Sequence, residues 1–484
     1  MRRTQRAQLE DALGLPPPPP AATPLAADVY TEAADAPPRA WAAPGEPGPD
    51  GVYACAPLCN AAALALPPAA ADAFDLVWPL RGGRFAVRAD QPLSVVRAAL
   101  EASWRAALRD SLGLDEDSIR ACSAVLVAPL TLGAREVREL ATLLLCRLGF
   151  KSLAVHAESS AAAFAAGAPL VCVVLAGAHT AAVTCCEEGV EVPGSRLVLP
   201  LGGDDAADAL PWLAARSSGA PWPLPRCSPR TSPADAEVLR QLLRQAARAP
   251  SDGAQPARHD AGAVTLVSPA HADGPGAPAR RFAFRLGDAA SLAPLGFFAP
   301  RVLGAPRHAA TARAHRAASA GLGADGADTD DPLQEMLAAF EAPRDDAAAD
   351  AVGLDTAVMA SIAAASAGRP DVRTRLQASI LLAGGAAATP GLADALRERC
   401  AARLPAAERA AATVAAVVAL PDPRLCAWRG GALLGAADAA REGWVRREAM
   451  EEGVAVGRPG RYDMAASLLA QLQTFAQQFS LTTT

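Results

Sequence analysis

Lysine is nearly absent from this chain of 484 residues. Lys151 is the only lysine among its 45 basic residues, so arginine carries almost all of the positive charge. The sequence is also rich in alanine, and the two biases together indicate a genomic preference. Alanine alone is therefore weak evidence for a helix here, because it reports codon usage as much as helix propensity.

Long apolar runs are missing as well. The sequence contains no run of the roughly 18 uncharged apolar residues that a membrane-spanning helix needs. The start, MRRTQRAQLEDALGL, is basic, but Glu10 and Asp11 argue against a transit peptide, and no apolar segment precedes the proline run. We expect a soluble intracellular protein without a membrane partner.

Organised metal ligands are lacking too. Ten cysteines are scattered through the chain; Cys185 and Cys186 are adjacent and Cys55 and Cys59 are close, but no matched CxxC pairs or spaced histidines accompany them. The six histidines share no metal-ligand spacing. We therefore expect reduced, buried thiols and no metal site.

The chain has no excess of positively charged residues either. The net charge is −6 at pH 7, so any contact with nucleic acid would need a local arginine patch. One arginine-rich segment, Arg441 to Arg447 with Trp444 between, is predicted to lie on a helix. A solvated helix face is its simplest interpretation, although tryptophan with arginine is also typical of binding anchors.

Hydrophobic residues make up 51% of the chain, which is enough for the cores of two or more domains. Residues 1–71 are rich in proline and alanine and are predicted to be a flexible segment. We expect a first folded half at 72–168 and a second at 169–450. Within the second half we expect a subdomain insertion at 218–280 and a low-complexity loop at 304–350, followed by a divergent tail at 451–484.

Strand and helix patterns alternate in both halves, which predicts α/β layers around a partly parallel sheet. In the first half we predict strands at 84–88, 124–128 and 153–156, and helices at 93–112, 134–148 and 158–166. In the second half we predict strands at 171–175, 181–186, 195–201, 379–383 and 413–419. Helices are predicted after Gly203, at 234–247, at 353–367, from Thr389 and from Trp428. This order is that of a ribonuclease-H-like domain.

Two segments with paired glycines are the most informative motifs. The first is an apolar strand from Ser379 that ends in Gly384 and Gly385, before a helix opened by Thr389 and Pro390. Alone, such a pair indicates a tight turn. The second, Asp-Pro-Arg-Leu-Cys-Ala-Trp-Arg-Gly-Gly-Ala-Leu-Leu, follows at residues 422–434.

The two linked motifs resemble those of the actin superfamily, in which the first binds adenosine and the second starts the following helix. The amino-acid sequence of the second motif is more similar to the actin-related protein 8 family, a nuclear branch, than to actin. Further similar segments are 78–83, 148–150, 155–159, 284–288 and 353–355, so the resemblance covers about 72–450. It implies an actin-like fold of two ribonuclease-H-like domains, the first without its N-terminal hairpin.

The resemblance also implies a degenerate nucleotide site. Actin-like ATPases use two Asp-bearing glycine hairpins, whose carboxylates hold hydrated Mg²⁺ and whose N–H groups hold phosphates. The second-half hairpin corresponds to residues 174–180, where Leu175 and Ala178 replace the acidic residues, and we find no first-half hairpin. We expect a vestigial nucleotide-binding site of Glu158, Gly177, Gly202, Gly203, Gly384 and Gly385, with no catalytic residue and no metal ligand.

The acidic residues in and next to this predicted site need separate consideration. Asp204 and Asp205 follow Gly202 and Gly203, and an acidic pair at a helix start is typical of a helix cap. Glu158 occupies the position that orients the attacking water in actins, but a base there would need a metal-held phosphate beside it.

The function implied by the resemblance is that of a non-catalytic nuclear scaffold in an INO-eighty type chromatin-remodelling complex. Its partners would be a helix of the motor subunit, actin, another nuclear actin-related protein, and nucleosome or linker DNA. No cofactor is required, although ATP is allowed. The alternative is a superfamily member that uses ATP as a structural ligand or hydrolyses it slowly. A filament-forming actin is disfavoured by the 304–350 insertion and the divergent ends.

Overall fold

The computed structural model describes residues 30–32, 57–66, 74–81, 83–88, 91–218, 222, 224, 233–249, 264–268, 279–284, 286–303, 352–404, 417–419, 422–438 and 444–450. The loop expected at 304–350 and the tail expected at 451–484 lie outside these residues, so both stay predictions. None of the described helices is long and apolar enough to cross a membrane.

The first half is built on a small sheet in which β4 (Ser123–Ala128) pairs in parallel with β5 (Ser152–Ala157). The helices of this half are α2 (Asn60–Leu64), α4 (Leu93–Leu112), α5 (Glu116–Ala121), α6 (Ala134–Thr142) and α7 (Glu158–Ala166). A π-helical turn, η1 (Leu143–Arg147), continues α6. The predicted helices at 93–112 and 158–166 are confirmed to the residue, and a left-handed glycine, Gly113 or Gly167, ends each.

A buried carboxylate ties a short hairpin to this half. The hairpin joins β2 (Leu80–Arg81) to β3 (Arg84–Phe85), a shorter strand than the predicted 84–88. Glu136, which is 1% exposed, accepts hydrogen bonds from the backbone N–H of Phe85 at 3.0 Å and of Gly133 at 2.9 Å. Its ion pair with Arg84 completes the neutralisation of a charge that burial would otherwise penalise.

The second half contains a six-stranded sheet with the order β13-β12-β6-β7-β8 and β9 paired to β7. Its strands are β6 (Leu170–Ala176), β7 (Ala181–Glu187), β8 (Val190–Glu191), β9 (Leu197–Leu199), β12 (Ile380–Ala383) and β13 (Val417–Ala419). Both faces of β6 are buried: Cys172, Val174 and Ala176 pack into one core cluster, while Val171 and Val173 pack into another. A strand covered on both faces reads as a continuous apolar run, as this one does.

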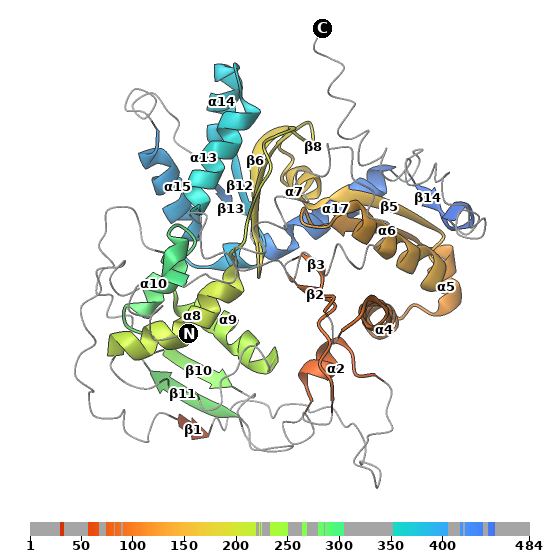
Figure 1. The fold of residues 1–484 in the computed structure, drawn as a ribbon, viewed down its shortest axis with the longest axis horizontal. Helices are drawn as coiled ribbons and strands as arrows, with labels where there is room; N and C mark the ends of the chain where they lie inside the picture. Colours follow the sequence, from red (N-terminus) through yellow and green to blue (C-terminus); the bar gives the residue numbers. More distant parts are fainter. Residues whose placement is uncertain are drawn as a thin grey trace.

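Helices cover this sheet on both sides (Figure 1). On one side lie α13 (Leu354–Ala365), α14 (Pro370–Gln377) and α15 (Leu392–Ala402), of which α14 was not predicted. On the other lie α7 and α17 (Cys426–Asp438), and Ala162, Ala163 and Cys426 pack into the same core cluster as Val171. A 3₁₀ turn, η4 (Ala386–Ala388), precedes α15, and another, η5 (Pro423–Leu425), precedes α17.

A separate group of elements follows β9. It comprises α8 (Gly203–Ser218), α9 (Pro233–Ala246), β10 (Val264–Ser268), β11 (Arg280–Phe284), α10 (Ala289–Leu295) and the 3₁₀ turn η3 (Pro300–Leu303). Part of the segment expected to be flexible is ordered here, because β1 (Tyr30–Glu32) pairs antiparallel with β11. The prediction for residues 1–71 is therefore wrong at these residues, and at α2. The open edge of β11 supplies the hydrogen bonds that a three-residue strand cannot make alone.

The C-terminal part of the described chain returns to the first half. A strand of two residues, β14 (Val445–Arg446), pairs antiparallel with β5, and Val445 and Met450 lie in the first-half core. The expected second half therefore does not extend unbroken to 450. The helix expected over 441–447 is also wrong for Val445 and Arg446, which form this strand, while residues 441–443 lie outside the described chain.

Three glycines on α17 allow this helix to pack closely against the first half. A Cβ on Gly430 would lie 1.6 Å from the carbonyl oxygen of Ala161 in α7, and one on Gly431 or Gly435 would lie 2.5 or 2.6 Å from a valine side chain of β4. Only glycine lets α17 approach α7 this closely. The paired glycines of the second motif are thus required by helix packing.

We expect Gly430→Ala to lower the free energy of unfolding by about 2 kcal/mol, because the methyl group would meet backbone. This sign opposes helix propensity, which favours alanine over glycine by about 1 kcal/mol. Gly385→Ala is the control, since nothing lies within 4 Å of its Cβ position, and it should change stability by less than about 0.5 kcal/mol. Urea unfolding measures both, and a neutral Gly430→Ala would contradict the packing argument.

Candidate functional site

Three turns of the second half meet at the ends of β6, β7 and β12. The β6–β7 turn contacts the start of α8, where the N–H of Gly203 donates to the carbonyl of Gly177 at 3.0 Å and that of Asp204 donates to Ala178 at 2.7 Å. The turn after β12 joins them, since Gly384 has φ of 101° and a Cβ there would lie 2.3 Å from the carbonyl oxygen of Ala176. Three loops that are distant in sequence thus form one small backbone cluster.

The predicted glycines differ in how far this packing requires them. A Cβ on Gly202 would lie 2.3 Å from the Ala178 carbonyl oxygen, and one on Gly203 would lie 3.1 Å from the Cβ of Ala386. Gly385, by contrast, has an ordinary helical φ of −65° and open space around its Cβ position. Packing therefore explains Gly202, Gly203 and Gly384, whereas it leaves Gly385 unexplained.

The two paired-glycine motifs also touch each other. The N–H of Gly384 donates to the carbonyl of Pro423 at 2.9 Å, which joins the end of β12 to η5. The separation of the two motifs in the sequence therefore corresponds to a direct backbone contact.

The N-terminus of α8 is occupied by the protein itself. A helix start binds phosphate through free N–H groups, but those of Gly203 and Asp204 already donate to the β6–β7 turn. The N–H of Gly202 donates to Asp205 Oδ2 at 2.9 Å, so Asp205 caps the helix as one interpretation of the sequence predicted.

Asp204 forms an ion cluster instead of a cap. Arg240 on α9 donates to both of its carboxylate oxygens at 2.6 Å, and His179 Nε2 of the β6–β7 turn lies 3.5 Å from Oδ2. Burial lowers the pKa of His179, and Asp204 opposes this shift while Arg81 and Arg240 add to it. His179 is thus neutral at pH 7. The sequence did not reveal this cluster, because Asp204 and Arg240 belong to different helices.

The two positions that lack carboxylates hold apolar residues, of which Leu175 is buried and Ala178 is exposed. Leu175 is 5% exposed and packs in the same core cluster as Ala383, and Ala178 follows the turn glycine. Carboxylates would be needed to hold hydrated Mg²⁺. Across the described ranges no group of three or more His, Cys, Asp or Glu residues is arranged to hold a metal ion.

Glu158 lies on a different element from the glycines. It is the first residue of α7 and is partly buried, which raises the pKa of its carboxyl group. The Cys426 thiol of α17 is a neighbour, and burial raises the pKa of this thiol to about 11. The next residue, Ser159, donates a hydrogen bond to Glu191. Of the six predicted residues, Gly177, Gly202, Gly203 and Gly384 meet, and the assignment of all six to a nucleotide stays a prediction.

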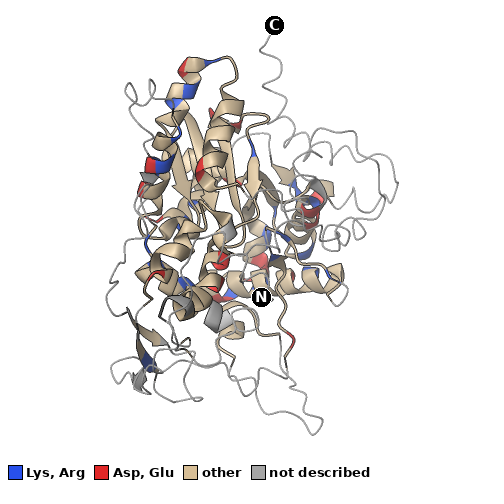
Figure 2. Cartoon of the chain, turned by 60° about the vertical axis from the view of Figure 1, so that its left-hand side comes forward, with Lys and Arg blue, Asp and Glu red and all other residues tan. Residues whose placement is uncertain are grey.

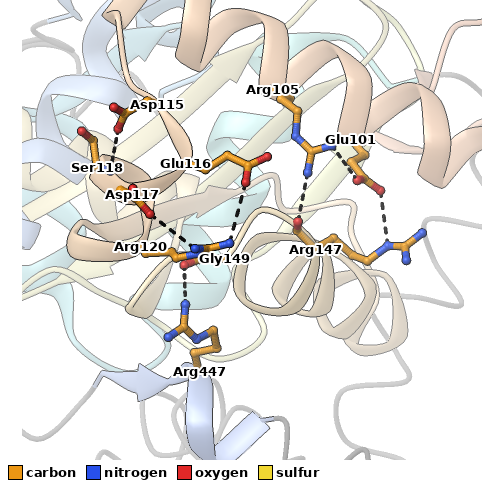
Figure 3. A network of polar contacts seen from close by, with 10 residues as sticks. All are labelled: Glu101, Arg105, Asp115, Glu116, Asp117, Ser118, Arg120, Arg147, Gly149 and Arg447. Atoms are coloured by element: carbon orange, nitrogen blue, oxygen red, sulfur yellow. Dashed lines mark hydrogen bonds and ion pairs between the residues drawn. The ribbon is translucent and has the colours of Figure 1, made fainter.

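Charges on the first half are largely compensated (Figure 3). Glu101 pairs with Arg105 at 3.1 Å and with Arg147 at 3.3 Å, and Arg120 lies near two carboxylates of α5. Arg447 donates to the Gly149 carbonyl at 2.9 Å, which fastens β14 to the turn before β5. Blue positions (Lys and Arg) and red positions (Asp and Glu) are interspersed along the ribbon in Figure 2. The arginines in Figure 3 therefore do not form the uncompensated patch that nucleic acid requires.

Comparison with known proteins gives consistent likenesses. The family model described as Actin matches residues 278–456. Actin-related protein 9 of Arabidopsis thaliana is 30% identical over 413 residues, which cover 84% of this chain and 66% of that protein. Actin-related protein 9 of Oryza sativa is 29% identical over 432 residues, which cover 85% of this chain and 69% of that protein. Actin-related protein 8 of Bos taurus is 26% identical over 451 residues, with 79% and 70% covered.

A solved structure of human actin-related protein 8 in its ATP-bound state matches with a TM-score of 0.65 and 25% identity, over 85% of this chain and 72% of that one. These likenesses confirm the resemblance drawn from the paired-glycine motifs and extend it to a plant protein group that the motifs did not suggest.

We expect Arg240→Gln to raise the pKa of His179, because Arg240 is one of the positive charges that lower it. Asp204→Asn should lower the pKa further, since it removes the carboxylate that favours the protonated ring. Arg244→Gln is the control, as Arg244 bonds Glu237 on the same helix. NMR titration of the imidazole measures each variant, and identical His179 titrations in all of them would contradict the cluster.

Proposed function

We propose, because this chain belongs to the actin superfamily, that it is a non-catalytic nuclear scaffold subunit of an INO-eighty type chromatin-remodelling complex. One observation carries the non-catalytic part: the β6–β7 hairpin has Leu175, in β6, and Ala178, in the turn, where actin-like ATPases have carboxylates. The nuclear and remodelling parts rest on the resemblance to actin-related protein 8.

The surroundings of the turn support the absence of catalysis. At the start of α8 the N–H groups of Gly203 and Asp204 donate to the carbonyls of Gly177 and Ala178. The carboxylate of Asp204 accepts a hydrogen bond from Arg240. A general base must be deprotonated beside the proton it removes, and burial shifts Glu158 toward its protonated form. Positioning and charge stabilisation supply nearly all phosphoryl-transfer catalysis, and both depend on groups that this turn lacks.

A scaffold needs a docking surface, and α7 with α17 offers an apolar one. Four of the nine large hydrophobic residues that are exposed in the described chain lie on α7, on α17 or just before it. Phe164 is 45% exposed, Leu425 41%, Trp428 67% and Leu433 51%. Figure 1 shows the two helices side by side. We call these four residues the α7–α17 surface.

The chemistry of this surface favours an amphipathic helix as its occupant. Such a helix docks through apolar anchors spaced three or four residues apart, and tryptophan is among the residues that dominate binding energy. Arg429 is exposed next to Trp428, which favours acidic residues on the partner, whereas the exposed Arg424 already pairs with Asp422 at 3.0 Å. We assign the α7–α17 surface to the helix of the motor subunit, along which actin and another nuclear actin-related protein would also pack.

Support for nucleosome or linker DNA engagement is indirect under this proposal. The compensated arginines of the first half argue against direct binding there, so the chain would assist DNA contact by positioning the motor subunit. A direct contact would have to use other surfaces.

Use of ATP as a structural ligand is the second candidate function. It is favoured by the ATP-bound state of the matching human structure and by Gly385, whose missing side chain no neighbour requires. In this case Gly384 and Gly385 would hold adenosine without either carboxylate.

We expect no ATP hydrolysis above background by the full chain, and the same background from Glu158→Gln. Phosphate release at saturating ATP and Mg²⁺ measures both. Release that falls in the Glu158→Gln variant would contradict the non-catalytic proposal. Calorimetric titration with ATP and Mg²⁺ separates the two candidates, because binding at millimolar or tighter Kd without release would favour the structural-ligand function.

We expect Trp428→Ala and Leu433→Asp to weaken binding of the motor-subunit helix by about 30-fold each, since loss of an interface anchor costs roughly 2 kcal/mol. Leu112→Asp is the matched control, because Leu112 is 66% exposed at the end of α4, away from this surface. Fluorescence anisotropy with a labelled helix gives the Kd values. Equal weakening of helix binding by all three variants, or no weakening by any of them, would contradict the assignment of the α7–α17 surface to the motor-subunit helix.

A further inference from the structure

Two cysteines face each other across the β6–β7 hairpin. Cys172 on β6 and Cys185 on β7 are direct partners in the strand register. Both side chains are fully buried and belong to the same core cluster, so they project from the same face of the sheet.

Backbone hydrogen bonds define the type of pair. The N–H of Cys172 donates to Ser379 beside β12 at 2.9 Å, away from β7. The carbonyl of Cys185 accepts from Val192 at 2.8 Å, and its N–H donates to Ser195 Oγ at 3.1 Å, both away from β6. The two cysteines therefore form a non-hydrogen-bonded pair, in which opposed Cα atoms lie about 4.5 Å apart. Disulfides join Cα atoms that are roughly 4.4–6.8 Å apart.

The two thiols are also in contact. A hydrogen bond links them, and the direction we assign is from the Cys172 S–H to the Cys185 sulfur, which lowers the pKa of Cys185 against the effect of burial. Ser361 Oγ lies 3.5 Å from the same sulfur. Cys185 is thus the better nucleophile of the pair, since the thiolate is the reactive form.

We propose that Cys172 and Cys185 form an oxidisable dithiol, which hydrogen peroxide converts into a disulfide across the β6–β7 hairpin. The Cys185 sulfur attacks one peroxide oxygen, the O–O bond breaks and water leaves, so that Cys185 becomes a sulfenic acid. The Cys172 sulfur then attacks Cys185, the S–S bond forms and a second water leaves. In total the two thiols lose two electrons and two protons, and these reduce one peroxide to two waters.

The geometry selects this pair over the other thiols. Cys186 follows Cys185 directly but packs into the opposite core cluster, since successive strand residues project to opposite faces. Cys426 belongs to that same opposite cluster. Cys400 on α15 shares the core of the pair but is not its strand partner.

A disulfide here would fix the element that carries Gly177. It would close a short loop that contains the whole β6–β7 turn and so restrict the unfolded chain, which raises thermal stability. The backbone cluster around Gly177, Gly203 and Gly384 would be held in place with it. This inference is independent of the remodelling role, because it rests only on the hairpin.

The test uses the full chain treated with hydrogen peroxide, then alkylated under denaturing conditions and digested for mass spectrometry. We expect one cross-linked species that joins the Cys172 and Cys185 peptides, a mass loss of two hydrogens, a raised Tm, and reversal of all three by dithiothreitol. Because both thiols are buried, the disulfide should form more slowly than oxidation of the partly exposed Cys59.

Cys185→Ala should abolish the cross-link and the rise in Tm, whereas Cys186→Ala, which removes the adjacent thiol on the other face, should retain both. The wild-type peptide map decides the question even if a variant fails to fold. Prolonged peroxide treatment, continued well past complete oxidation of Cys59, that leaves Cys172 and Cys185 alkylatable would overturn the proposal. Cross-linking of other cysteines, or separate over-oxidation of the two thiols, would overturn it as well.

Discussion

The close packing of α17 on α7 is the constraint on which the arrangement of this molecule depends. Gly430 allows backbone contact with Ala161, so the helix that follows the second sheet lies against a helix of the first half. The next residues of α7, Ala162 and Ala163, pack in turn against the second-half sheet. One layer of two helices therefore joins the halves, and it also carries exposed hydrophobic side chains of the α7–α17 surface.

The candidate site is a cluster of turns that close backbone packing holds together. The turns at the ends of β6, β7 and β12 meet there, and Gly202, Gly203 and Gly384 are needed for this packing. The polar groups of the cluster bond to one another: helix N–H groups bond to the β6–β7 turn, and Asp204 bonds to Arg240. Leu175 is buried near the end of β6, and burial lowers the pKa of His179 in the turn.

Sequence reasoning succeeded where the determinants are local. The helices at 93–112 and 158–166 were predicted to the residue, since apolar spacing and a terminal glycine define each, and the paired glycines identified the fold. It failed where partners come from distant segments. Strands of two or three residues, such as β14 and β1, have no period to detect, and the Asp204–Arg240 pair exists only because α8 packs on α9. Glu158 and Gly385 could be placed, but a role for them needs a ligand.

The return of β14 to β5 has a consequence for how the chain is made. The sheet of the first half receives its third strand from residues 445–446, and Val445 and Met450 complete the core beneath it. Domains synthesised first commonly fold first on the ribosome, but the third strand of this sheet is synthesised only after the described elements of the second half. The half that is translated earliest is thus completed by residues that are translated late.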